Sequence, residues 1–326
     1  MKNNMIRQIF GIIVFMMMVS VSGSSQELGA GLGYQMTLIR NPGLTGSEGS
    51  GLIRLSYLNY YPGYNYDLHF ISLSYDGYFP SLHGGAGFFL TNDYLGGIVN
   101  NIQGGFSYSY FFQAGKDLFI SAGLSASIYH RGYNIGNAIL PDQIDPAGMV
   151  INPSGEFLSD RGTSLLDLST GMVFFAGNLT GGIAVSHLTR PETGNSPGLG
   201  GRLDRSLLFH LAGEINISSE RNLKLRPLGK FEVENNFFSG GAGAVLESNY
   251  LSVSSILLYD NENNFDIQTG FSLQKGTLMV SYNYRFNVFS GSNMMPFSIL
   301  HQTGIALILN NIEKRKTVKT INFPKL

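Results

Sequence analysis

IQGGFSYSYFFQAGKDLFISAGLSASI, from Ile102 to Ile128, contains the strongest structural pattern in this sequence. Its two halves are separated by the turn-forming segment Gln113–Asp117, and within each half apolar residues alternate with small polar ones. Ser107, for example, stands between Phe106 and Tyr108. A period of two over about ten residues is typical of a membrane strand with lipid on one face and a polar lumen on the other.

The same pattern recurs along the chain, from a strand near Leu52–Asn59 to a last one near Ile299–Leu309. We count about fourteen such segments, an even number that suits a closed antiparallel barrel. Closure leaves no strand edge with unpaired backbone groups in lipid. The sequence therefore predicts an all-β fold, a transmembrane antiparallel β-barrel of about fourteen strands.

The connections between these segments differ in length. Ala176–Asn178, Asp260–Asn264 and Gln274–Gly276 are short and turn-like, whereas 132–163 and 189–203 are long. Short turns at one end of a barrel and long loops at the other are typical of bacterial outer-membrane barrels. This layout places the long loops outside the cell.

The composition separates this prediction from its alternatives. Charged residues make up 13% of the chain, whereas soluble domains carry about 25%. A soluble, exported β-sandwich or jelly roll would need more surface charge. The chain has no Cys and no Trp, so thiolate chemistry is excluded and aromatic girdles must use its 23 Phe and 17 Tyr. A net charge of -1 gives no reason to expect nucleic acid as a partner.

Four regions follow from the pattern. Residues 1–25 have a basic start, an apolar run and small residues before Gln26, which predicts a cleaved signal peptide. Residues 26–49 predict a glycine-rich, plug-like segment in the lumen, with a fifteenth strand through Leu28–Leu38 as the alternative. Residues 50–309 form the predicted barrel. Residues 310–326 form a basic tail that we expect in the periplasm.

Several phrases resemble the PorP/SprF family of type IX secretion membrane proteins from Bacteroidota. The segment Asn41-Pro42-Gly43-Leu44-Thr45-Gly46 is similar to the family's Asn-Pro-Ala-(aromatic or Leu)-(Ala/Thr)-Gly element. The resemblance continues in order through the mature chain, and departs from the family where Leu58 replaces Arg and Tyr60-Tyr61 replaces Gln-Trp. The residues that carry it are Asn41, Pro42, Gly46, Arg54, Tyr57, Asn59, Pro62, Tyr75, Asp76, Asp145 and Pro146.

The resemblance implies a non-enzymatic outer-membrane accessory protein of type IX secretion. Such a protein supports export or surface attachment of a cognate secreted protein, such as a gliding adhesin with a type IX C-terminal signal. Its expected partners are outer-membrane lipid, that cargo and other secretion components. The alternative is an outer-membrane channel for uptake of a small solute, because a lumen rich in Ser, Gly, Asn and Tyr fits both functions. An outer-membrane hydrolase is a third alternative.

Charged residues in the two long loops are the candidates for binding a partner. They are Asp142, Asp145, Glu156, Asp160, Arg190 and Arg202. The four acids lack the alternate spacing of a calcium loop, and the six His residues lack the spacing of a zinc site. The chain has no Gly-x-Ser-x-Gly element. We therefore expect no catalytic residue, no cofactor and no metal.

Overall fold

The computed structural model describes residues 37–63, 67–134, 139, 141–145, 148–150, 162–192, 202–220, 222–290 and 299–309. The predicted signal peptide, the basic tail and residues 26–36 of the predicted plug-like segment lie outside these ranges. So do Pro146, Glu156 and Asp160. Within the described ranges, no helix has both the length and the apolar character to cross a membrane.

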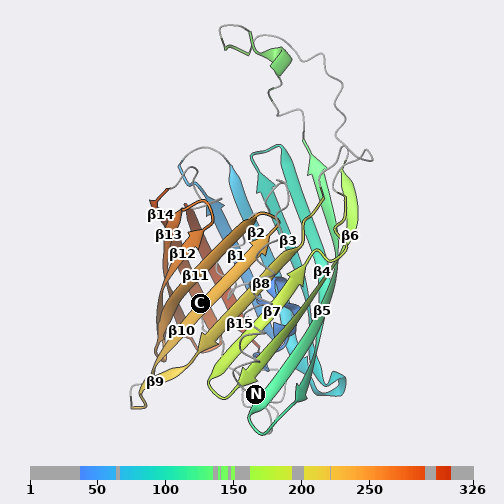
Figure 1. The fold of residues 1–326 in the computed structure, drawn as a ribbon. Coiled ribbons are helices and arrows are strands. Elements are labelled where there is room, and N and C mark those ends of the chain that lie inside the picture. Colours follow the sequence, from blue (N-terminus) through green and yellow to red (C-terminus); the bar gives the residue numbers. More distant parts are fainter. Residues whose placement is uncertain are drawn as a thin grey trace, which may run out of the picture.

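The chain forms one antiparallel sheet that closes on itself (Figure 1). Its strands are β1 (Leu52–Tyr60), β2 (Leu68–Phe79), β3 (Gly84–Leu95), β4 (Val99–Gln113), β5 (Leu118–Tyr133), β6 (Thr163–Ala176), β7 (Leu179–Ser186), β8 (Ser206–Gly213), β9 (Ile215–Ser218), β10 (Leu223–Glu234), β11 (Phe237–Glu247), β12 (Leu251–Asp260), β13 (Phe265–Lys275), β14 (Leu278–Phe289) and β15 (Leu300–Ile308).

Fourteen strand positions make up the ring. Each strand pairs with its neighbours in sequence, β15 pairs with β1, and β10 pairs with β11. β8 and β9 occupy one position, because both pair with β10 on either side of a break at Glu214. The predicted fourteen-stranded antiparallel barrel is confirmed. The break within β8–β9 was not predicted.

The strands present alternate faces as the sequence pattern predicts. Phe106 and Leu124 are 75% and 64% exposed on the outer face, where lipid covers a membrane barrel. Ser109 and Ser121, on the same two strands, are fully buried inside. An apolar outer face is stable only in lipid, since in water it would be a very large exposed hydrophobic surface.

The lumen is not lined by polar side chains alone. Apolar side chains of the strands, joined by Leu44 from the segment before β1, also pack together inside the barrel in three places. These groups are Leu58, Tyr60, Phe70 and Leu300; Leu44, Tyr78, Phe111, Val173 and Phe175; and Ala212, Leu228, Val245, Ile256 and Leu258. Inward apolar packing of this kind fills and stiffens part of a barrel's interior.

The two ends of the barrel differ. Short turns join β2–β3, β4–β5, β6–β7, β9–β10, β11–β12 and β13–β14 at one end, while the segments 134–162 and 187–205 join strands at the other. The turn at Asp260–Asn264 lies at the long-loop end, so connection length alternates less strictly than we expected. The long-loop end also holds the short helix η4 (Pro141–Gln143), in the β5–β6 connection.

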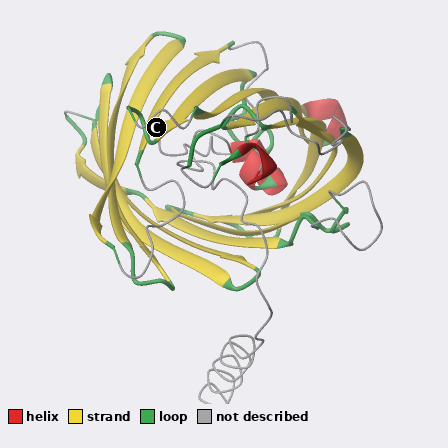
Figure 2. Cartoon of the chain, turned by 90° about the horizontal axis from the view of Figure 1, so that it is seen from above, coloured by secondary structure: helices red, strands yellow, loops and turns green. Residues whose placement is uncertain are grey.

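The segment before β1 lies inside the barrel, as the view along its axis shows (Figure 2). It contains a single helical turn, α2 (Thr37–Arg40), and a 3-10 turn, η1 (Pro42–Leu44). Leu38, Asn41 and Thr45 are buried there. A further 3-10 turn, η2 (Pro80–Leu82), joins β2 to β3.

Candidate functional site

Residues 40–46 cross the lumen, and we call this segment the strap. Its shape follows from its sequence. Asn41 has an extended backbone, and its side-chain Oδ1 accepts a hydrogen bond from the Gly43 N–H at 2.9 Å, which caps η1. Pro42 begins the turn with a pre-set φ angle. The Thr45 hydroxyl donates to the Pro42 carbonyl at 2.8 Å, so the segment holds its own bend.

One end of the strap is tied to β2 through a carboxylate. Asp76 Oδ2 accepts a hydrogen bond from the Gly46 N–H at 2.7 Å, and Asp76 Oδ1 accepts one from the Arg54 guanidinium at 2.5 Å. Asp76 is 1% exposed and Arg54 is 8% exposed. Three residues of the family resemblance therefore meet at one point. A buried carboxylate with both oxygens bonded is stable, whereas the same carboxylate without its cation is costly.

The wall beneath the strap is made of glycines. A Cβ atom on Gly85 would lie 1.9 Å from the Thr45 carbonyl oxygen, and one on Gly123 would lie 2.2 Å from that of Pro42. A Cβ atom on Gly171 would lie 2.0 Å from Asn41 Oδ1. Real atoms do not approach so closely, so only glycine permits this packing at β3, β5 and β6. The sequence gave no indication that these three positions form a set.

Two serines of β4 supply polar contacts on the same wall. Thr45 and Ser107 bring their hydroxyl oxygens within 2.6 Å, and the Ser109 hydroxyl donates to the Thr45 carbonyl at 2.7 Å. Both serines are buried. The strap backbone thus replaces the water that a lumen-facing serine would otherwise bind.

The other end of the strap reaches the far wall. Asn41 Nδ2 lies 2.9 Å from His210 Nε2 on β8, and it donates to the Ile183 carbonyl of β7 at 3.4 Å. Arg40 forms an ion pair with Glu232 on β10. Since β2 and β10 lie on different sides of the ring, the strap connects two walls of the barrel. Spacing along the chain gave no indication of His210 or Glu232 as partners.

The remaining residues of the resemblance lie elsewhere. Tyr57 and Tyr75 are on outward positions of β1 and β2, and their rings lie near His69 and Phe88 at centroid distances of 6.1 and 5.8 Å. Asn59 is half-buried near the long-loop end of β1, and Pro62 follows in the β1–β2 connection. These four residues do not contact the strap in any interaction that the structure describes.

The charged loop residues that we predicted to bind a partner do not form one cluster in the described part of the loops. Arg190 pairs with Asp204 at 2.8 Å, and Arg202 pairs with Glu192 at 2.5 Å, both within the β7–β8 connection. In the β5–β6 connection, Asp145 Oδ1 accepts a hydrogen bond from the Met149 N–H at 2.7 Å and closes a turn, and Asp142 is exposed. These residues shape their own loops. Among the described residues, no cluster of His, Cys, Asp and Glu fits a metal ion.

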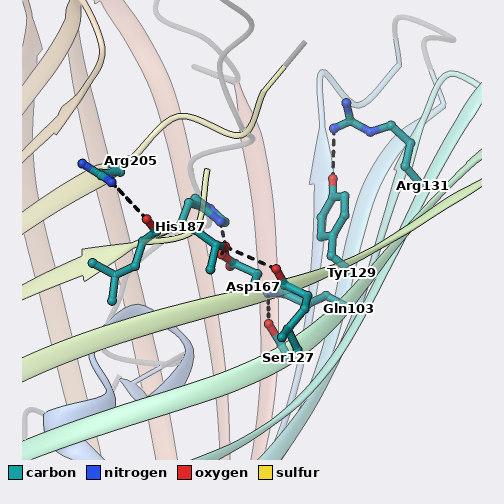
Figure 3. A network of polar contacts seen from close by, with 10 residues as sticks. Gln103, Ser127, Tyr129, Arg131, Asp167, His187 and Arg205 are labelled. Carbon is teal, nitrogen blue, oxygen red and sulfur yellow. Dashed lines mark hydrogen bonds and ion pairs between the residues drawn. The ribbon is translucent and has the colours of Figure 1, made fainter. Parts of the chain in front are cut away.

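A polar network lies on the long-loop side of the strap (Figure 3). His187 Nδ1 is 2.8 Å from Asp167 Oδ2, and both side chains are buried. Gln103 donates to the Ser127 hydroxyl at 2.9 Å, and Arg131 donates to the Tyr129 hydroxyl at 2.9 Å. Gln103, Tyr129 and His187 of this network line a cavity of about 90 Å³, together with Ile39 and Arg40 of α2. The sequence gave no reason to single out His187.

Comparison with known proteins bears on identity. Residues 33–298 match the model of a family described as type IX secretion system membrane protein PorP/SprF. A search of curated proteins gave no match. Similar solved structures include the outer membrane protein Omp33 of Acinetobacter baumannii, with 9% identity over 82% of this chain and 100% of that chain and a TM-score of 0.47. The Pseudomonas putida toluene transporter TodX has 10% identity over 83% of this chain and 93% of that chain, with a TM-score of 0.47. The family match covers most of the chain, including the strap and all but the last strand.

Proposed function

The chain belongs to the PorP/SprF family of type IX secretion system membrane proteins, and we propose that it is a non-enzymatic accessory barrel of that system. In this proposal the barrel sits in the outer membrane and supports export or surface attachment of a cognate secreted protein, such as a gliding adhesin. The long loops carry specificity for the cargo, and the barrel supplies a rigid anchor.

The strap is the observation that supports an anchor most directly. It crosses the lumen and is fixed at both ends by ion pairs, the buried pair Asp76–Arg54 and the partly buried pair Glu232–Arg40. A diffusion channel is better served by an unobstructed lumen. A strap that joins opposite walls instead stiffens the barrel against deformation when a surface protein pulls on it.

The loop arrangement supports recognition at one end. The 134–162 and 187–205 connections both leave the end that faces outside in an outer-membrane barrel, and loops positioned by a rigid scaffold are frequent binding sites. The pairs Arg190–Asp204 and Arg202–Glu192 hold the described part of the second connection in shape.

Deleting the gene and comparing surface proteomes tests the proposal. We expect viable cells that lose one or a few surface proteins, and complementation with the intact gene restores them. Replacing residues 192–202 by a short Gly/Ser linker should abolish restoration. The matched control replaces the turn 114–117 at the opposite end of the barrel, and it should restore the cargo. Unchanged surface and secreted proteomes after deletion would contradict the proposal.

A channel for a small solute is the second candidate, because a polar cavity lies on the long-loop side of the strap. Planar bilayer recordings separate the two. The anchor predicts no steady conductance from the purified full-length barrel. A channel predicts a stable open level in the unaltered protein, which does not depend on the substitution Asp76→Asn.

A further inference from the structure

The cavity above the strap has the properties of a binding site. It lies between α2 and the inner faces of β2 to β7, where Phe89, Thr91 and Asp93 line it from β3. These residues lie between the strap contact at Gly85 and the end of β3 that leads toward the long-loop side. The cavity therefore faces the exterior side of the strap.

Its wall presents hydroxyl groups that are available to a ligand. Thr91, Ser125, Ser169 and Ser186 line the cavity, and their hydroxyls make no hydrogen bond to the part of the chain that the structure describes. Thr91 and Ser125 are nevertheless buried. Buried hydroxyls are normally hydrogen-bonded, and a ligand with matching donors and acceptors would satisfy these.

Of the charged groups beside the cavity, Arg40 and His187 each face a carboxylate, and Asp93 is hydrogen-bonded to a neutral amide. Arg40 pairs with Glu232, His187 pairs with Asp167, and the Asn101 amide donates to Asp93 at 3.2 Å. An anionic ligand would meet the Asp93 carboxylate and a cationic one the Arg40 guanidinium, whereas the hydroxyls of a neutral ligand could donate to Asp93. The electrostatics therefore favour a neutral ligand.

The apolar part of the wall is aromatic. Phe70, Phe89 and Tyr129 contribute rings to the same cavity and are all buried. A ligand that suits rings on one side and hydroxyls on another carries both C–H faces and hydroxyl groups. The cavity volume of about 90 Å³ corresponds to about three water molecules at about 30 Å³ each, so it takes one edge of a sugar ring while the rest of the ring lies in the lumen.

We infer that this cavity binds one neutral sugar unit, either as a free sugar or as the terminal unit of a cell-surface polysaccharide. The ring C–H face would lie against Phe89 and Tyr129, and its hydroxyls would bond to Ser125, Ser169 and Gln103. This site goes beyond the proposed secretion role and does not depend on it, since cargo attachment is assigned to the loops.

Saturation-transfer NMR on the purified full-length barrel tests the inference. The protein is kept in amine-oxide micelles, because detergents with sugar headgroups would compete. The probes are glucose, galactose, mannose and N-acetylglucosamine, each up to about 10 mM, which detects dissociation constants near the millimolar range. We expect saturation transfer to the ring protons of at least one sugar. A second arm repeats the measurement with polysaccharide released from the producing cells, which distinguishes a terminal unit from a free sugar.

Two serines of β5 provide a matched pair of variants. Ser125→Ala removes a cavity hydroxyl and should weaken binding about two- to twelvefold, the effect of one hydrogen bond of about 0.5–1.5 kcal/mol. Ser121→Ala makes the same change on the same strand on the short-turn side of the strap and should leave binding unchanged. Ser125→Leu should fill the cavity and abolish binding, while the characteristic gel shift of a folded barrel confirms that the variant folds.

Three results would overturn the inference. They are no saturation transfer to any sugar or to the polysaccharide, binding that Ser125→Leu leaves intact, and tighter binding of a neutral Ser–Gly hexapeptide than of every sugar. None of these results affects the gene-deletion experiment, so this inference and the proposed function can fail separately.

Discussion

Asp76 shows how single residues hold this barrel together. One carboxylate binds the strap through Gly46 and the wall through Arg54, so it joins the strap to the barrel wall. The sequence placed Asp76, Arg54 and Gly46 in one family resemblance but gave no physical reason for it. That reason is a shared contact between residues up to 30 positions apart, which spacing along the chain does not reveal.

Asp76→Asn should lower the free energy of unfolding by about 3 kcal/mol, because Arg54 keeps its charge in a buried place without a counter-charge. Urea titration of the purified barrel in micelles, followed by circular dichroism, measures the change. Asp117→Asn alters the same chemistry in the exposed β4–β5 turn and should cost less than about 0.5 kcal/mol. Equal losses of unfolding free energy in the two variants would show that the Asp76 contacts do not stabilise the barrel.

Gly123→Ala should also destabilise the barrel, by about 1–3 kcal/mol, because the added methyl group meets the Pro42 carbonyl at 2.2 Å and pushes the strap from its wall. Gly132→Ala is the control on the same strand, since its Cβ would meet nothing closer than 3.7 Å. Both variants are compared by the same urea titration. A Gly123→Ala barrel as stable as the Gly132→Ala barrel would argue against close packing at this site.

At the scale of elements, dyad alternation predicted the strands and their orientation well. Fourteen predicted segments correspond to fourteen strand positions, and the apolar sides face outward as expected. Strand ends were less accurate: β3 covers Gly84–Leu95, whereas the clear alternation covers only 86–90. Glycines and the polar residues Asn92 and Asp93 weaken the pattern there, although the backbone pairing with β4 continues.

The strap is the element that alternation does not describe. Its fixing to β10 predicts a measurable coupling between Arg40 and Glu232. A double-mutant cycle with Arg40→Ala and Glu232→Ala should give a coupling of about 1.5–3 kcal/mol, as expected for a partly buried ion pair joined by a hydrogen bond. The exposed pair Arg202–Glu192 is the control cycle and should give about 0–1 kcal/mol. A coupling for Arg40–Glu232 no larger than that of the control pair would show that this ion pair does not fix the strap to β10.

For the whole molecule, the sequence predicted the barrel but not the contents of its lumen. A period of two assigns each side chain to lipid or to the interior, and it carries no information about which interior groups meet across the ring. Asn41 and His210 are 169 positions apart and lie on different elements. The glycines at 85, 123 and 171 become a set only when the sheet closes and the strap lies over them.

Disulfide trapping in intact cells tests most directly whether the strap lies inside a closed outer-membrane barrel, against the wall formed by β4. The natural chain has no Cys, so Thr45→Cys with Ser107→Cys introduces a single pair where the two hydroxyl oxygens are 2.6 Å apart. We predict that this pair forms a disulfide in the outer membrane, detected by a gel shift that reducing agent reverses. Thr45→Cys with Ser281→Cys, which places the second thiol on β14, should remain reduced. A barrel in which the first pair stays reduced, or in which both pairs cross-link equally, would contradict this structure.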